Sequence, residues 1–258
     1  MHEGRRAPLA IKSLRAGVMV AALLLGLMAF YLGSAHAAHI RTVRAIIIGG
    51  SAASGWNDPL GHGYVERGLM AYGQAEGLHF VITNYGIPGA PTVDARVAAN
   101  YGHWLSRLGR HGLVVLAWGM LNDLRLHVQP AATAAAIHAE IALALQHGDD
   151  VLIVAPPLTR LSVGKWRNEE ARLVRLEYSI AEGFHSQRIH LANTYFTEMH
   201  LWTQQHARAF RFMYNGYDPN LRGYKLAGTL LTTALERTWS TGPAVPATLG
   251  AMLRSARR

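Results

Sequence analysis

The chain contains no cysteine. This absence excludes disulfides, cysteine-ligated metal sites and a cysteine nucleophile, and it is compatible with an oxidising environment. Acidic residues are also scarce, because 16 Asp and Glu stand against 25 Lys and Arg, which gives a formal net charge of +9. Half of the residues are hydrophobic, which is ample for a packed core.

The basic residues do not form a stripe interleaved with aromatic residues, so a nucleic-acid partner is not favoured. They are scattered along the chain, apart from Arg254, Arg257 and Arg258 near its end. Such a distribution favours weak attraction to anionic surfaces. We expect residues 240–258, which also hold Gly, Pro and small residues, to form a flexible basic tail.

The N-terminal segment, residues 1–37, has the pattern of an export signal. Four basic residues precede the apolar run of residues 16–32, and small residues follow around Ala35 and Ala37. The pattern predicts a secretory signal peptide cleaved after Ala37, or an uncleaved membrane anchor, since the run is just long enough to span a bilayer. Both alternatives place the globular part, residues 39–239, outside the cytoplasm: secreted, periplasmic or anchored on the outer side of the cytoplasmic membrane.

Apolar β-branched runs alternate with helical patterns about five times along the rest of the chain. The expected strands cover residues 45–48, 79–83, 113–118, 151–155 and 188–192, and the expected helices cover 62–76, 93–108, 131–146, 169–183, about 197–208 and 221–238. Thr92 is the expected N-cap of the second helix. The alternation predicts one α/β domain with about five parallel strands and helices on both faces of the sheet. The loops that follow the strands would then converge on one edge.

The first strand ends in Gly49-Gly50-Ser51, which would place Ser51 at the ligand-binding edge of such a sheet. The alternative interpretation is an ordinary strand-to-helix turn with an incidental serine. The stretch lacks the Gly-Lys-Ser/Thr ending and the Gly-x-Gly-x-x-Gly spacing, so a nucleotide cofactor is not expected. No pair of histidines with a carboxylate stands at zinc-ligand spacing, so no metal is expected either.

Acyl transfer requires a nucleophile and hydrogen-bond donors for the developing oxyanion. Ser51, the backbone N–H of Gly89 and the side-chain amide of Asn122 would supply these groups from three loops. Taken singly, Gly89 also fits a turn and Asn122 a helix cap. Trp56, Trp118 and Trp166 fall in or near the same loops, and they fit either loop packing or an apolar, sugar-stacking wall.

Three segments resemble motif blocks of the SGNH hydrolases, also called GDSL-type esterases and lipases, which have a flavodoxin-like α/β fold. Residues 48–51 resemble the first block, with Gly50 in place of the usual Asp. Residues 84–89 resemble the second block. Residues 119–123 resemble the third block, with one more residue between Gly and Asn than in the commonest form. The resemblance implies a flavodoxin-like three-layer fold. It also implies that Ser51 is the nucleophile and that Gly89 and Asn122 form the oxyanion hole.

The fourth block departs from the family pattern, Asp-x-x-His-Pro-Asn-x-x-Gly-Tyr. Residues 215–224 match its flanking positions, but Asp218 stands at the histidine position and Asn215 at the position of the orienting aspartate. A serine hydroxyl needs a positioned base near neutral pH, and a carboxylate with a pKa near ~4 is a poor one. Burial would make Asp218 a better base by raising that pKa.

Three interpretations follow from this departure. In the first, Asp218 acts as a weak base. In the second, a histidine elsewhere in the chain reaches Ser51; the candidates are His62, His200 and His206, although a histidine at such a position is more often a surface residue. In the third, the domain has lost hydrolysis and keeps a binding pocket. The first two describe an exported serine ester hydrolase or acyltransferase. The third describes a pseudo-enzyme that binds an acylated glycan, lipid or peptide. The expected partner in each case is a small-molecule, glycan or lipid ester.

Overall fold

A computed structural model describes residues 41–204 and 210–239. The expected signal or anchor, the C-terminal tail and His206 lie outside the described residues. Within the described part, no helix is both long enough and apolar enough to cross a bilayer.

The centre of the domain is a five-stranded, wholly parallel sheet with the strand order β2-β1-β3-β4-β5. The strands are β1 (Arg41–Gly49), β2 (Leu78–Asn84), β3 (Leu113–Ala117), β4 (Asp150–Val154) and β5 (Ile189–Ala192). This order is the doubly wound, flavodoxin-like one, and it confirms the predicted fold class. The carboxyl ends of β1 and β3 lie beside each other, so the loops that follow them meet at one edge.

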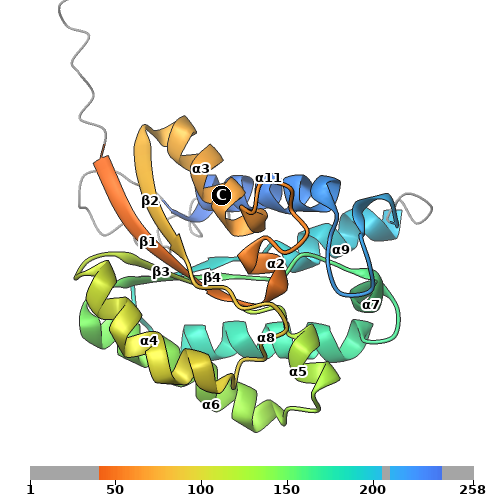
Figure 1. The fold of residues 1–258 in the computed structure, drawn as a ribbon, viewed down its shortest axis with the longest axis horizontal. Helices are drawn as coiled ribbons and strands as arrows, with labels where there is room; N and C mark the ends of the chain where they lie inside the picture. The colour runs from red at the N-terminus through yellow and green to blue at the C-terminus, as the bar shows by residue number, and fades with distance from the viewer. Residues whose placement is uncertain (1–40, 205–209, 240–258) are drawn as a thin grey trace, which may run out of the picture. The chain divides into compact units, whose positions relative to one another are not determined.

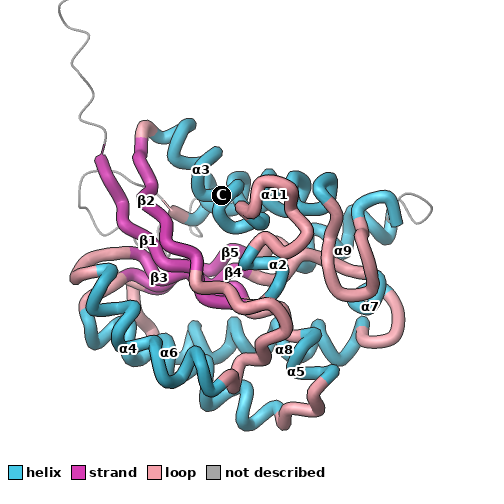
Figure 2. Tube along the Cα trace, viewed as in Figure 1, coloured by secondary structure: helices cyan, strands magenta, loops and turns pink. Residues whose placement is uncertain are grey.

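Helices cover both faces of the sheet (Figures 1 and 2). The helical segments are α2 (Ser51–Ser54), α3 (Gly63–Glu76), α4 (Ala95–Leu108), α5 (Leu121–Arg125), α6 (Pro130–His147), α7 (Arg160–Val163), α8 (Arg167–Gly183), α9 (Tyr195–Gln204), the 3₁₀ turn η1 (Phe210–Phe212) and α11 (Leu221–Thr238). Helices α3 and α11 lie on one face, and α4, α6 and α8 lie on the other. The domain is therefore a three-layer α/β/α structure.

The central strands are apolar along their whole length because both of their faces are covered. Consecutive side chains of a strand point to opposite faces. Ile47 and Val115 accordingly pack with α3 and α11, whereas Ile46 and Leu116 pack with α4, α6 and α8. All four side chains are fully or almost fully buried. Burial of one such side chain stabilises the fold by roughly 1.5–3 kcal/mol.

The predicted helix cap at Thr92 is wrong. The cap lies two residues later, at Asp94, whose carboxylate accepts the cap hydrogen bond from the Arg96 N–H at 2.9 Å, and α4 begins at Ala95. Thr92 is buried and contacts a different partner, Asp123, described below. The sequence analysis also missed α2, α5 and α7, because helices of four or five residues are too short to show a helical period.

Candidate active site

Ser51 is the first residue of α2, directly after β1 ends. The strand comes so close to β3 at this point that a Cβ on Gly49 would overlap with the Ala117 carbonyl, so only glycine fits there. The Ser51 carbonyl accepts hydrogen bonds from the Ser54 hydroxyl at 2.8 Å and from the Trp56 N–H at 3.0 Å. The Ser51 hydroxyl and N–H have no hydrogen-bond partner among the described residues. Both groups are therefore available to a ligand.

One side of the site, which we call the oxyanion wall, consists of residues 84–92 and 119–125. Asn84 attaches this wall to the helix of Ser51, because its side-chain amide donates to the Ala53 carbonyl at 2.8 Å. Its oxygen accepts from the Gly86 N–H at 2.9 Å, which holds the turn that leads to Gly89. Gly89 has a φ of +79°, a left-handed conformation that favours glycine. Its N–H donates no hydrogen bond within the described part of the chain.

Asn122 enters the site through a strained turn. Met120, which precedes α5, has a φ of +46°, uncommon for a residue with a side chain, although its side chain is fully buried. This conformation accommodates the additional residue of the third motif block. The Asn122 amide donates to the Ala90 carbonyl at 3.1 Å, which leaves its second N–H for a ligand. A Cβ on Gly50 would lie 3.3 Å from the same amide nitrogen, so glycine at this position leaves room for Asn122.

Asp123 joins the two segments of the oxyanion wall, a role that the sequence analysis missed. Its carboxylate accepts hydrogen bonds from the Thr92 N–H at 3.1 Å, the Thr92 hydroxyl at 2.5 Å and the Thr133 hydroxyl at 3.0 Å. Asp123 is only 1% exposed. Burial raises the pKa of Asp123, and the hydrogen bonds from Thr92 and Thr133 partly oppose this rise. The carboxylate fixes the spacing between Gly89 and Asn122.

Arg125 was also missed by the sequence analysis. Its guanidinium lies 3.3 Å from the Gly89 carbonyl oxygen and 3.5 Å from the Asn122 side-chain oxygen. The second contact orients the Asn122 side chain so that its N–H groups, rather than its oxygen, face Ala90 and the site. Arg125 therefore bridges the two residues to which the family resemblance assigns the oxyanion hole.

The opposite side, which we call the base wall, consists of residues 156–166 and 213–219. The Asn215 amide donates to Asp218 Oδ2 at 3.1 Å, and Asn215 Oδ1 accepts from the Asp218 N–H at 2.7 Å. Asn215 thus orients Asp218, as the family's aspartate orients its histidine. Asp218 is 5% exposed, and its Oδ1 is buried without a hydrogen-bond partner among the described residues. This oxygen has lone pairs available to accept a proton.

A cleft of about 210 Å³ brings the predicted residues together. Its lining includes Ser51, Gly89, Asn122 and Asp218, together with Arg125. Asn215 is not among the described residues that line the cleft, but it contacts two residues that are, Asp218 and, through its N–H, Tyr217. Among the described residues, no histidine lines the cleft; His62 instead contacts Glu66 at 2.7 Å, and His200 is exposed on α9.

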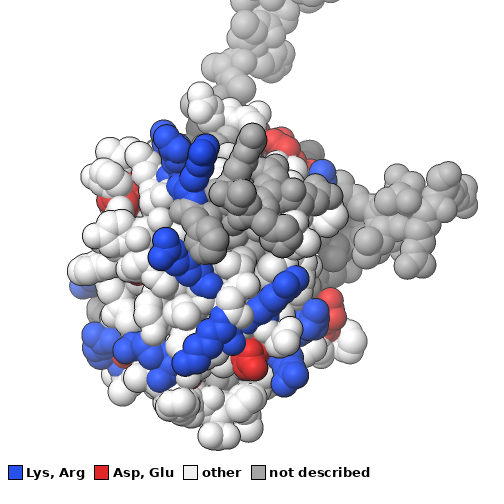
Figure 3. Space-filling model, turned by 90° about the vertical axis from the view of Figure 1, so that its right-hand side faces the viewer, with Lys and Arg blue, Asp and Glu red and all other residues white. Residues whose placement is uncertain are grey.

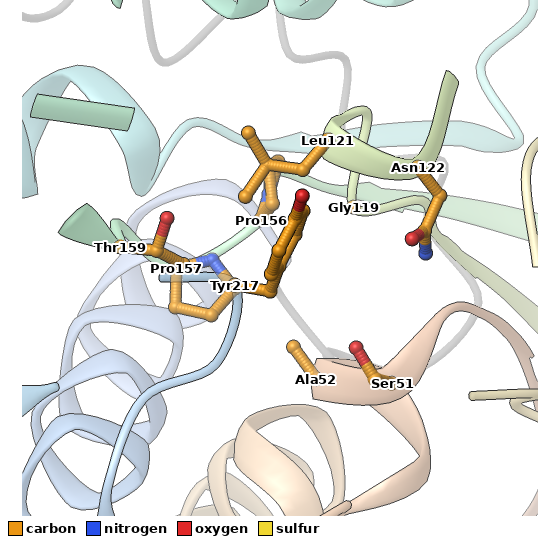
Figure 4. Close-up of a pocket in the computed structure, with 9 residues that line it drawn as sticks. All are labelled: Ser51, Ala52, Gly119, Leu121, Asn122, Pro156, Pro157, Thr159 and Tyr217. Carbon is orange, nitrogen blue, oxygen red and sulfur yellow. The ribbon is translucent and has the colours of Figure 1, made fainter. Parts of the chain in front are cut away.

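A smaller pocket of about 20 Å³ adjoins Ser51 on the side of the base wall. Figure 4 shows the Ser51 hydroxyl pointing toward the space between Asn122 and Tyr217, with Pro157 and Thr159 beyond the tyrosine ring. Tyr217 lines both cavities, so it separates the cleft from the loop that follows β4. The sequence analysis gave this residue no role.

The three tryptophans near the loops have different environments. Trp118 does not line the cleft, because its ring is fully buried and its indole N–H donates to Glu140 at 2.8 Å. Trp56 is 52% exposed and lines the cleft. Trp166 is partly buried, and its ring centre lies 6.1 Å from that of Tyr217. The loop-packing interpretation thus describes Trp118, and the ligand-wall interpretation suits Trp56.

Buried carboxyl groups support the base wall from behind. Glu198 accepts a hydrogen bond from the Leu158 N–H at 3.0 Å, and Glu170 accepts one from the Tyr195 hydroxyl at 3.3 Å. Burial raises the pKa of Glu170 and that of Glu198 to about 8. One oxygen of each group has no hydrogen-bond partner within the described part. These raised pKa values favour the protonated form of both side chains at neutral pH.

The described residues contain no group of three or more His, Cys, Asp or Glu side chains that could hold a metal ion. The arrangement instead supplies a hydroxyl, three N–H donors and a carboxylate around one cleft. These are the components that attack on an ester carbonyl requires.

No curated protein sequence matches the chain. Its fold is similar to that of a lipase/acylhydrolase from Enterococcus faecalis, with a TM-score of 0.56 at 18% identity over 78% of this chain and 100% of that one. It is also similar to the acetylxylan esterase Axe2 from Geobacillus stearothermophilus, with a TM-score of 0.58 at 17% identity over 77% of this chain and 94% of that one. The model of the GDSL-like lipase/acylhydrolase family matches residues 47–226. The chain therefore belongs to the GDSL-like lipase/acylhydrolase family.

Proposed function

We propose that the protein is an exported serine ester hydrolase or acyltransferase with Ser51 as its nucleophile. The observation that carries this proposal is the convergence of Ser51, Gly89, Asn122 and Asp218 on one cleft. Membership of a family of lipases and acylhydrolases supports the reaction class. The N-terminal sequence pattern supports export.

In the first step, the Ser51 hydroxyl oxygen attacks the ester carbonyl carbon while its proton moves to the Asp218 carboxylate. The N–H groups of Ser51 and Gly89 and the second N–H of Asn122 stabilise the resulting oxyanion. The tetrahedral intermediate collapses to an acyl-enzyme, and the departing alcohol takes the proton from Asp218. Water or a second alcohol then attacks the acyl-enzyme with Asp218 again as the base, which regenerates the Ser51 hydroxyl.

A carboxylate in place of histidine makes this a slow catalyst, because it is a weaker base near neutral pH. Burial of Asp218 and its contact with Asn215 hold the carboxylate in place. The exposed aromatic side chains of Trp56 and Tyr217 at the cleft suit an apolar acyl chain or a sugar ring. A small-molecule, glycan or lipid ester is the substrate class that fits.

Labelling with an alkyl fluorophosphonate, followed by intact mass measurement, tests the proposal. We expect one adduct on the wild-type domain and none on the Ser51→Ala variant. Ser54→Ala, which changes a nearby serine of the same short helix, is the matched control and should still label. An adduct that persists in Ser51→Ala would contradict the assignment of the nucleophile.

A binding protein without turnover is the second candidate function. The absence of a hydrogen bond between the Ser51 hydroxyl and any described base favours it. In that case the cleft would hold an acylated glycan, lipid or peptide, and the folded wild-type protein would give no fluorophosphonate adduct. The same experiment therefore separates the two functions.

A further inference from the structure

A second pocket, larger than the catalytic cleft, lies between α8 and α9. Its volume is about 320 Å³, against about 210 Å³ for the cleft. Arg167, Arg172 and Arg175 line it from α8, and Tyr195 and Phe196 line it from α9. None of the described residues that line it is acidic. We call this cavity the α8–α9 pocket.

The three arginines lie within an arc of roughly 140° around α8, because Arg172 and Arg175 are three residues apart and Arg175 follows Arg167 by eight residues. None of them takes part in an ion pair among the described residues. Three positive charges that share one pocket repel one another, and a bound anion would remove this repulsion.

The three arginines of the pocket are exposed, whereas the two aromatic residues that line it from α9 are buried or partly buried. The Arg175 guanidinium lies 4.9 Å from the centre of the Phe196 ring, which holds it against the pocket wall. Tyr195 is completely buried, and its hydroxyl contacts Glu170 behind the pocket. Burial raises the pKa of Tyr195, while the charges of Arg167 and Arg175 oppose this rise, so both guanidinium groups lie near the phenol.

One aromatic contact links the beginning of α8 to the catalytic cleft. Arg167 directly follows Trp166 in the chain, and the Trp166 ring contacts Tyr217, which lines the cleft. Lys165 adds a further positive charge on this path, with its amino group 5.0 Å from the Trp166 ring centre. Figure 3 shows the side of the molecule on which α7 and α9 lie, and Lys and Arg are more widespread there than Asp and Glu.

We propose that the α8–α9 pocket binds an anionic group, a carboxylate or a phosphate, of an extended saccharide ester whose acyl group reaches Ser51. Guanidinium groups bind both anions through paired hydrogen bonds. The aromatic rings of Trp166 and Tyr217 along the path suit the apolar faces of sugar rings. None of the exposed large apolar side chains of the described part lies on α8 or α9, so the surface lacks the apolar anchors of a membrane-binding helix. This inference rests on the proposed function.

The test measures binding by calorimetry on Ser51→Ala protein, so that turnover does not interfere. The ligands are a tetrasaccharide of galacturonic acid, the same tetrasaccharide with its carboxyl groups reduced, inorganic phosphate, and vesicles that contain phosphatidylglycerol. We expect the acidic tetrasaccharide to bind at least tenfold more tightly than the reduced one. Arg167→Gln with Arg175→Gln should remove this difference. Arg107→Gln with Arg237→Gln, which neutralises two exposed arginines on α4 and α11, should leave it within twofold.

Equal affinity for the charged and the reduced tetrasaccharide would overturn the inference, as would the same loss in both pairs of variants. If phosphate binds as tightly as the acidic tetrasaccharide, the pocket is a site for a free anion. If only the vesicles bind, the pocket is a membrane-binding site. Either result would also overturn the inference. The proposed function is tested by a different measurement: it fails if the wild-type protein gives no fluorophosphonate adduct on Ser51.

Discussion

The two walls of the cleft differ in how completely their polar groups are paired. In the oxyanion wall, the carboxylate of Asp123 accepts hydrogen bonds from both Thr92 and Thr133. On the side of the base wall, Asp218, Glu170 and Glu198 each have a buried oxygen without a partner among the described residues. A buried polar atom without a partner costs free energy, so the second side is the less stable one.

This difference coincides with the departure from the family pattern. The motif residues of the oxyanion wall, Gly89 and Asn122, are retained, and their supporting contacts are complete. The two replaced positions of the fourth motif block, Asn215 and Asp218, both lie in the base wall. Stabilisation of an oxyanion and activation of a nucleophile are separate parts of catalysis, and one can weaken while the other persists.

The largest expected effect comes from restoring the family pattern in the base wall with Asn215→Asp and Asp218→His together. Histidine has a pKa near ~6.5, which suits a general base at neutral pH, and such a base contributes roughly 10²–10⁴-fold to rate. We expect kcat/KM for p-nitrophenyl acetate to rise at least 100-fold. Asp218→His alone should raise kcat/KM by less, because the neutral Asn215 side chain would orient the imidazole but would not supply the negative charge that an aspartate places beside it. No gain in the double variant would mean that the oxyanion wall is not arranged for acyl transfer.

The next largest effect concerns the support of the oxyanion wall. Asp123→Ala leaves three buried donors of Thr92 and Thr133 without an acceptor, and we expect it to lower the free energy of unfolding by about 3 kcal/mol. The measurement is urea unfolding. Asp218→Asn is the matched change in the base wall and should shift stability by less than about 1 kcal/mol. Equal effects of the two changes would show that the walls do not differ in this way.

Much of this arrangement could be predicted from the sequence. The apolar runs gave the strands, and their alternation with helical patterns gave the parallel sheet, because periodicity and burial are properties of the local sequence. The family motifs then singled out Ser51, Gly89 and Asn122, which the structure places on one cleft.

The supporting contacts could not be predicted, because they join positions far apart in the chain. Asp123 binds Thr92, which had been expected to cap a helix, since Thr is a common cap and its partner is 31 residues away. Trp118 was expected near a loop, but it follows β3 into the core, where Glu140 of α6 accepts its N–H. The α8–α9 pocket depends on the packing of two helices, so no single segment contains it.

An effect that is smaller per pH unit is expected from the buried acids behind the base wall. Because burial raises the pKa of Glu170 to about 8 in the folded protein, the native state holds a proton that the unfolded chain releases near its ordinary value. This stabilisation is complete below the unfolded-state pKa and is lost as pH rises toward 8, by up to about 1.4 kcal/mol per pH unit. We expect Glu170→Gln to reduce that slope in urea unfolding between pH 5 and pH 8. Glu169→Gln, at the adjacent exposed position, should not; equal slopes in both variants would contradict the protonated state of Glu170.

The smallest expected effect is that of Arg125, whose guanidinium contacts Gly89 and Asn122 at the long distances of 3.3 and 3.5 Å. Arg125→Gln removes the contact that orients Asn122, so we expect the rate of fluorophosphonate labelling of Ser51 to fall about fivefold, which corresponds to about 1 kcal/mol. Arg107→Gln, an exposed arginine on α4, is the control for charge and should leave the rate unchanged. Arg125→Lys retains the charge but not the planar fork that reaches Gly89 and Asn122 together. If it labels as slowly as Arg125→Gln, then Arg125 acts through geometry; if it labels at the wild-type rate, then its charge alone assists the oxyanion wall.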